Sequence, residues 1–173
     1  MSIIGQSDPT KVPRYVGFNT FARLPIGENL NKVDIGIIGI PFDAGCTYRT
    51  GARFGPEAIR RSSKLLRAYN VDQDTYPFAN RQVADMGDIE CTPFNNKLAV
   101  AQIYNRINDL FQIVQFPIFL GGDHTISYPI LKSLQCKYKL FNGITLIHFD
   151  SHMDTWEEYF TETITHGTPF KRA

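Results

Sequence analysis

The chain has 173 residues, of which 43% are hydrophobic, and 18 basic and 17 acidic side chains give it a formal net charge of +1. This near-neutral balance gives no reason to expect nucleic acid or an anionic membrane as a partner. The apolar content argues against a disordered polymer and suffices for a buried core. Three separated cysteines without a C-x-x-C pair argue against a disulfide framework or zinc knuckle. We therefore expect a cytoplasmic protein with reduced thiols.

The predicted elements begin after an irregular N-terminal arm at residues 1–32, which several prolines punctuate. Residues 33–40 (VDIGIIGI) form a nearly continuous apolar run, typical of a strand that is covered on both faces. A glycine-rich loop follows, and Pro56 is well placed to begin a helix. Arg60 and Arg61 are assigned to the solvated face of that helix. Its predicted apolar stripe is Ile59, Leu65, Leu66 and Tyr69.

The next predicted helix is capped by Asn95 or Asn96 and carries apolar residues at a regular spacing of three to four. A weak strand is predicted before this helix, at 81–85, and the helix itself extends to 114. It is followed by a strand at 116–120, a helix through 126–134 and a strand at 143–149. Strands that alternate with helices predict a parallel sheet with helices on its faces.

Two of these strands end in polar clusters, at the edge where open parallel sheets bind ligands. The first cluster is GGDH at residues 121–124, and the second is HFDSHMD at residues 148–154. In an extended chain, alternate side chains share one face. The second cluster is therefore predicted to present four polar side chains together: His148, Asp150, His152 and Asp154.

Carboxylates that are clustered without a counter-charge are costly, and divalent cations remove that cost. Mixed carboxylate and imidazole ligands without a thiolate favour Mn²⁺, with Zn²⁺, Fe²⁺, Co²⁺ and Ni²⁺ as open alternatives. The spacing also allows two metals about 3.5–4 Å apart. The alternative is a purely structural role, in which these side chains only cap turns. The pairing of D-x-H-x-D with G-G-D-H argues against it, although Asp123 itself is assigned to capping the following helix.

These motifs resemble the ureohydrolases, the arginase and agmatinase family. The resemblance is carried by VDIGIIGIPFD (33–43), YRTGARFGPEAIR (48–60), GGDHTISYP (121–129), HFDSHMDTW (148–156) and the His166-Gly167 pair. It implies a three-layer α/β/α sandwich around a parallel sheet, of the arginase/deacetylase type. Residues 33–173 would be the N-terminal portion of one such domain. The family's later D-x-D-x-x-D-P motif does not occur before Ala173, so we expect the C-terminal part of the sheet to be missing.

The resemblance also implies site roles, with two Mn²⁺ ions per complete site and no organic cofactor. His124 would bind one manganese and His152 the other, Asp150 would bridge them, and Asp154 would join His124. His166 matches the family's histidine near the substrate, and a near-neutral pKa suits proton transfer.

Four further side chains near the second cluster keep two interpretations each. His148 either orients a ligand residue or is a satisfied core histidine. Trp156, Tyr159 and Phe160 either line the mouth of the site or pack, and packing is favoured slightly.

The reaction that the resemblance implies is hydrolysis of a guanidino group to urea and an amine. Arginases carry polar groups that recognise the amino-acid end of arginine, where this chain has Trp156 and residues 163–165 (TIT). Agmatine is therefore the leading substrate, giving putrescine and urea as in polyamine biosynthesis. Guanidinobutyrate, guanidinopropionate, free guanidine, a formimidoylglutamase activity and a non-catalytic fragment remain alternatives. A small guanidino substrate and self-association of the full-length form into a homo-oligomer are the expected partners.

Overall fold

The computed structural model describes residues 2–139 and 143–173, and its centre is a parallel sheet with the strand order β2-β1-β3. The strands are β1 (Val33–Ile40), β2 (Val83–Asp88) and β3 (Val114–Gly121). The α-helices are α1 (Gly55–Ser63), α2 (Asn96–Leu110), α3 (Ser127–Tyr138) and the short α4 (Pro169–Arg172). Four 3-10 turns complete the list: η1 (Phe21–Arg23), η2 (Gly27–Asn29), η3 (Ala52–Phe54) and η4 (His124–Ile126).

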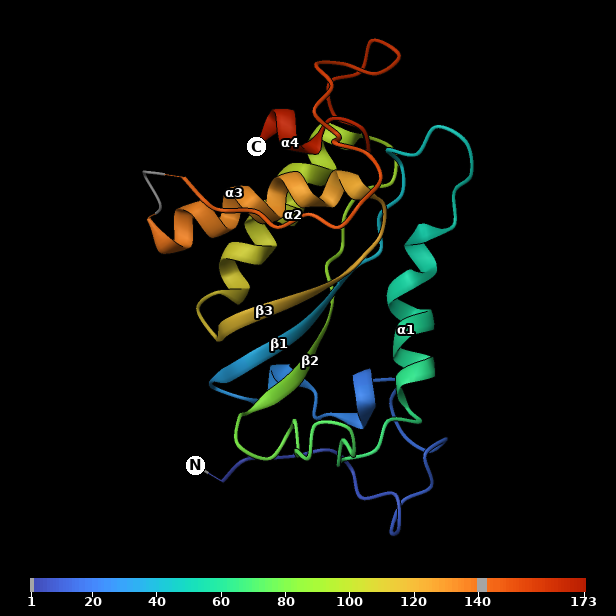
Figure 1. Cartoon of the computed structure of the whole chain (residues 1–173), viewed down its shortest axis with the longest axis vertical. Coiled ribbons are helices and arrows are strands. Elements are labelled where there is room, and N and C mark those ends of the chain that lie inside the picture. Colours follow the sequence, from blue (N-terminus) through green and yellow to red (C-terminus); the bar gives the residue numbers. More distant parts are fainter. Residues whose placement is uncertain (1, 140–142) are drawn as a thin grey trace.

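The predicted apolar strand is the middle strand β1, which pairs in parallel with both neighbours. Its isoleucines alternate between two cores because successive side chains of a strand point to opposite faces. Ile38 and Ile40 are fully buried in the core that includes α2, whereas Ile37 joins a smaller cluster with Ala22 and Leu24 of the arm. Helices α2 and α3 lie on one side of the sheet and α1 on the other (Figure 1). The described residues thus form helix, sheet and helix layers, as expected.

Helix α2 has the predicted cap and apolar face, but it ends at Leu110 rather than at 114, because Val114 already begins β3. Asn95 is the N-cap, and its side chain accepts a hydrogen bond from the backbone N–H of Leu98. Ile103 and Ile107, one turn apart, are completely buried against the sheet. An N-cap of this kind is worth about 1 kcal/mol.

Helix α1 departs from its prediction. It ends at Ser63, and the expected apolar stripe is largely exposed, with Leu65 73% exposed beyond the helix end. The buried face instead carries Arg60, which is only 6% exposed, so its assignment to the solvated face was wrong. The reason is electrostatic: the Arg60 guanidinium forms a bidentate pair with Asp85 of β2 at 2.8 and 3.0 Å and also reaches Asp88.

The strand predicted at residues 143–149 is also wrong, because the structure has no regular secondary structure there. Strand formation requires a ladder of backbone hydrogen bonds to a neighbour. Among the described residues β3 pairs only with β1, and the segment lies instead beside α3, across a cavity of about 380 Å³. The segment nevertheless reaches the carboxyl ends of the strands, where it meets η4 (Figure 1). Within residues 2–139 and 143–173, no helix is both long and apolar enough to cross a membrane.

Candidate metal centre and adjoining cavity

The polar residues singled out in the sequence meet at the carboxyl edge of the sheet. His124 begins the turn η4, directly after β3. Asp150 and Asp154 come from the segment that follows residue 149, and His166 precedes α4. Three chain segments thus converge at one edge, which is where parallel sheets place their ligands.

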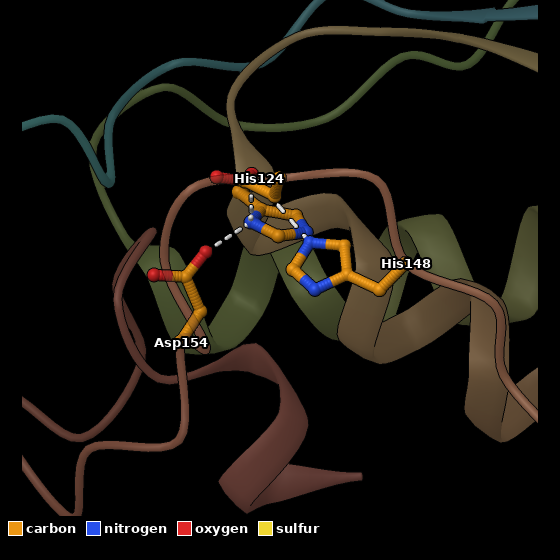
Figure 2. Close-up of side chains that lie close together, drawn as sticks. His124, His148 and Asp154 are labelled. Atoms are coloured by element: carbon orange, nitrogen blue, oxygen red, sulfur yellow. Dashed lines mark hydrogen bonds and ion pairs between the residues drawn. The ribbon is translucent and has the colours of Figure 1, made fainter.

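A compact group of four side chains forms the candidate metal centre: His124, His148, Asp150 and Asp154. One ligand atom from each lies within 4.8 Å of the others. His124 Nδ1 is 2.5 Å from Asp154 Oδ2 and 3.9 Å from Asp150 Oδ2, and His148 Nε2 is 3.5 Å from the same Asp150 oxygen. Figure 2 shows Asp154 and His148 approaching the His124 ring from either side. The group gathers two imidazoles and two carboxylates around one point.

Phe170 of α4 packs edge-on against both imidazoles, with ring centroids 5.1 Å from His124 and 4.7 Å from His148. Its backbone N–H donates to the carbonyl of Asp154 at 3.2 Å. The aromatic ring and this hydrogen bond restrict the rings and fix Asp154, which has the left-handed φ of 47°. Helix α4 therefore stabilises the arrangement of the group through Phe170.

The two carboxylates of the group have no lysine or arginine partner among residues 2–139 and 143–173. The pKa of Asp150 is held below its ordinary value, chiefly because the backbone N–H of His152 donates to its carboxylate at 3.0 Å. Asp150 therefore stays ionised beside a second acid. That arrangement attracts a cation.

The donor set fits a divalent metal of the Mn²⁺ to Zn²⁺ series, since it offers imidazole nitrogen and carboxylate oxygen without a thiolate. Metal–ligand distances of about 2.0–2.2 Å place two ligands of one ion no more than about 4.4 Å apart. The ligand atoms of the group lie within 4.8 Å of one another, a few tenths of an ångström beyond that limit. A small inward movement of these side chains would bring all four atoms within reach of one ion.

His152, expected as a ligand, lies at the margin of this group. Its side chain is 82% exposed, and its Nδ1 is 3.6 Å from Asp150 Oδ1. The expectation that all four alternate residues share one face was wrong for His152, because the chain turns here and is not an extended strand. His148 instead enters the group. Its position before D-x-H-x-D was the signal, but the sequence left its role open.

A cavity of about 560 Å³ adjoins the group on the side of His152 and Asp154. Trp156 and Tyr159 stack edge-to-face at 4.6 Å, and Tyr159 meets His166 in the same manner at 5.6 Å. Both aromatic residues therefore pack and line the cavity at once, whereas Phe160 is 76% exposed. The other cavity residues are His152, Met153, Asp154, Thr155, His166 and Gly167.

The backbone of the glycine-rich loop holds His166 in place. His166 Nδ1 donates to the carbonyl oxygen of Gly45 at 2.6 Å, and the His166 backbone N–H reaches the same oxygen at 3.3 Å. Gly45 in turn donates its N–H to Asp123 Oδ2 at 2.8 Å. Asp123 caps η4 by accepting from the N–H of Thr125 at 2.8 Å, as its assignment as a cap predicted. The contact to Gly45 could not be predicted from residue types, because every residue has a backbone carbonyl.

A second acid, Asp43, secures the other end of the same loop. Its carboxylate accepts from the N–H of Gly51 at 2.6 Å and from Arg53 Nε at 2.6 Å, and Arg53 also forms an ion pair with it. The Arg53 side chain, foremost among the causes, lowers the pKa of Asp43 to about 2. Arg53 is thus a structural partner of Asp43.

Comparison with known proteins agrees with this architecture. Guanidinobutyrase of Pseudomonas aeruginosa is 38% identical over 94% of this chain and 51% of its own length. The mitochondrial agmatinase of Gallus gallus is 37% identical over 94% of this chain and 47% of its own length. The chain thus spans about half the length of the curated relatives it matches.

Solved structures give the same result. Proclavaminate amidinohydrolase from Streptomyces clavuligerus superposes with a TM-score of 0.84 at 33% identity, over 92% of this chain and 52% of that one. A Trypanosoma cruzi formiminoglutamase solved with Mn²⁺ superposes with a TM-score of 0.72 at 25% identity, over 88% of this chain and 51% of that one. Residues 33–173 match the sequence profile of the Arginase family. The chain therefore belongs to the Arginase family, whose fold the sequence predicted.

Proposed function

We propose that this chain carries part of the active site of a metal-dependent hydrolase that cleaves a guanidino group to urea and an amine, with agmatine as substrate and putrescine as product. The observation that carries the proposal is the group around His124, in which two carboxylates face two imidazoles and pair with no lysine or arginine of residues 2–139 and 143–173, beside a cavity lined by His166. Family membership supports the same class of reaction.

The proposed ligands are His124, Asp150, His152 and Asp154, and the proposed metal is Mn²⁺, two ions in the complete site. The metal bound in the formiminoglutamase structure supports this choice. When bound, such ions supply Lewis-acid chemistry, which lowers the pKa of water enough for attack on a guanidino carbon at neutral pH. His148, 3.5 Å from Asp150, is proposed to orient that carboxylate.

His166 is the proposed proton carrier. Its Nδ1–H is committed to the Gly45 carbonyl, which leaves Nε2 as the ring nitrogen available for proton exchange. A guanidinium and one water give urea and an alkylammonium ion, so the departing amine nitrogen must gain both water protons. His166 Nε2 would accept the first proton as the water attacks and deliver it to that nitrogen, and the second would follow when the hydroxyl of the tetrahedral intermediate becomes the carbonyl of urea. Histidine suits both transfers because its ordinary pKa is about 6.5.

The charge of the cavity favours a substrate with a cationic tail. Apart from the proposed ligand Asp154, the acidic residues Glu158 and Glu162 lie in the loop that contributes Trp156 and Tyr159, and no lysine or arginine lines the cavity among the described residues. A carboxylate tail would face acidic groups without a counter-charge, whereas an ammonium tail would be attracted. Agmatine ends in an amine and guanidinobutyrate in a carboxylate, so agmatine is preferred. Arginine adds an α-carboxylate that the Trp156–Tyr159 wall leaves without a partner.

A panel of guanidines tests the proposal on the full-length protein with Mn²⁺. Urea release would be compared for agmatine, 4-guanidinobutyrate, 3-guanidinopropionate, guanidine and arginine, with formimidoylglutamate followed by ammonia release. We expect the highest kcat/KM for agmatine and at least about a tenfold lower value for arginine, the effect of about 1.4 kcal/mol of unpaired charge. The highest kcat/KM with guanidinobutyrate would reject the charge argument, and no urea from any guanidine would reject the proposed class of reaction.

A further inference from the structure

The contact chain from η4 to His166 passes through a single glycine. Asp123 Oδ2 accepts the N–H of Gly45 at 2.8 Å, and the carbonyl of Gly45 accepts His166 Nδ1 at 2.6 Å. Both hydrogen bonds use the same residue of the glycine-rich loop, one on its donor side and one on its acceptor side. A displacement of Gly45 would therefore be passed on to the His166 ring.

Asp123 is placed to hold Gly45 firmly. It is 7% exposed, and its other oxygen accepts the N–H of Thr125 at 2.8 Å. Its own backbone N–H donates to the carbonyl of Phe42 at 2.7 Å. The hydrogen bonds to Thr125 and Phe42 thus fix the position of Asp123, and its Oδ2 faces the N–H of Gly45.

The close packing around Gly45 explains why this position of the loop is a glycine. A side-chain Cβ at this position would overlap Thr125 Oγ1 and would lie 3.0 Å from Asp123 Oδ2 and 3.2 Å from the His166 backbone nitrogen. The close approach of three segments therefore requires a residue without a Cβ.

The contact at Gly45 selects one form of the neutral His166 ring. A carbonyl oxygen only accepts hydrogen bonds, so Nδ1 carries the hydrogen and Nε2 is unprotonated. A neutral imidazole free in water favours the opposite tautomer, with the hydrogen on Nε2. The loop thus holds His166 in the minor tautomer of the free side chain, with Nε2 ready to accept a proton.

We propose that Asp123 is a positioning residue that, through the backbone of Gly45, holds His166 in the Nδ1–H tautomer with Nε2 as the free nitrogen. The proposal rests on the proposed function only in assigning proton transfer to that nitrogen. The tautomer itself is a property of the folded chain and is measurable without turnover.

Nitrogen NMR of the protein labelled with ¹⁵N-histidine tests the proposal directly. The spectrum would be recorded after metal removal, near pH 8.5, about two units above the ordinary histidine pKa. The His166 signals are identified by their loss in His166→Gln. We expect a protonated Nδ1 and an unprotonated Nε2 in the unaltered protein. In Asp123→Asn, which loses one acceptor oxygen, the tautomer ratio should move toward Nε2–H about fivefold, the effect of weakening one ordinary hydrogen bond.

Asp43→Asn is the matched control, because the Asp43 carboxylate accepts its hydrogen bonds from Gly51 and Arg53, at the other end of the same loop. It should leave the His166 tautomer ratio within about twofold of the unaltered protein, since the hydrogen bonds that fix His166 remain. An equal shift in both variants would mean general loosening of the loop and would overturn the proposal. A predominantly Nε2–H ring in the unaltered protein would overturn it outright.

Gly45→Ala provides a second test if Asp123→Asn does not fold. The added Cβ must displace the loop, so the same shift toward Nε2–H is expected, and an unchanged ratio would contradict the proposal. In the full-length enzyme, Asp123→Asn should lower kcat while KM for agmatine stays within about twofold, because Asp123 does not line the cavity at His166. Absence of urea release by the unaltered enzyme would reject the proposed function, whereas the NMR result would still decide the tautomer.

Discussion

Two sets of carboxylates in this molecule differ in the groups with which they pair. Asp43, Asp85 and Asp123 are 1%, 2% and 7% exposed, and each accepts several hydrogen bonds from arginine or backbone donors. Asp150 and Asp154, with side chains 34% and 14% exposed, face histidines and each other. Donors of the chain itself hold the first set, whereas no lysine or arginine among the described residues pairs with the second.

The difference distinguishes carboxylates that stabilise the fold from carboxylates that are available to bind a metal. A carboxylate that the fold buries must find its donors within the fold, because desolvation without partners is costly. A pair of carboxylates that the fold brings together and leaves without a basic partner implies a cation from outside. On this argument, substitutions in the first set should reduce folding stability and substitutions in the second set should reduce metal binding.

The largest expected effect lies in the first set, at Arg60. Replacing it in Arg60→Met leaves Asp85 buried without its cation, while two backbone donors, Phe21 and Gly87, remain at 2.6 and 2.9 Å. Breaking a buried pair in this way costs about 3–5 kcal/mol. Urea unfolding should show that loss in the free energy of unfolding. Arg61→Met, at a side chain 71% exposed, is the control and should change the free energy by no more than about 0.5 kcal/mol.

The next effect belongs to the second set. In the full-length protein, Asp150→Asn should weaken Mn²⁺ binding and lower kcat by more than about 100-fold, beyond the loss typical for a residue that only supports a ligand. Folding stability of the metal-free protein should fall little, because this carboxylate is partly exposed. Metal content by mass spectrometry and urea release give both numbers. The exposed Asp109→Asn is the control, and normal metal content in Asp150→Asn would refute the ligand assignment.

The fold was predictable where local pattern and burial agree. The apolar run of β1 and the regular spacing of α2 gave their elements from sequence because burial dominates both. Helix α1 was misjudged because its buried residue, Arg60, is charged, and only its distant partners Asp85 and Asp88 make its burial favourable. Residues 143–149 have strand composition, but composition does not supply the neighbouring edge that a strand needs.

The candidate site was predictable in residue type more than in arrangement. The motifs identified His124, Asp150 and Asp154, which the structure brings together. They did not distinguish His148 from His152, because that choice depends on a turn of the backbone rather than on alternation. The hydrogen bond from His166 to Gly45 could not be predicted from the sequence, because its acceptor is a main-chain carbonyl 121 positions away.

The two uncertain histidines give a sharper test of the second set. We expect His152→Asn in the full-length protein to reduce Mn²⁺ affinity by more than about tenfold, as the loss of a ligand should. His148→Asn should reduce it by about tenfold, the lower limit for residues that orient a ligand. Isothermal titration with Mn²⁺ measures both. If His148→Asn costs more affinity than His152→Asn, the compact group in the present structure is the ligand set and His152 is a bystander.

The smallest expected effect is the pH dependence contributed by Asp43. Hydrogen bonds and charge from Arg53 hold its pKa at about 2 in the folded chain, below the ordinary value of 3.8. The folded state therefore binds the proton more weakly than the unfolded state, so the stabilisation is complete above about pH 3.8 and is lost as the pH falls toward 2. Urea unfolding of the unaltered protein and of Asp43→Asn at pH 5 and pH 3 isolates this contribution. The difference in unfolding free energy between the two proteins should be smaller at pH 3 than at pH 5, because protonation at the lower pH begins to remove what the substitution removes. A difference that stays constant over this range would contradict the lowered pKa of Asp43 in the folded chain.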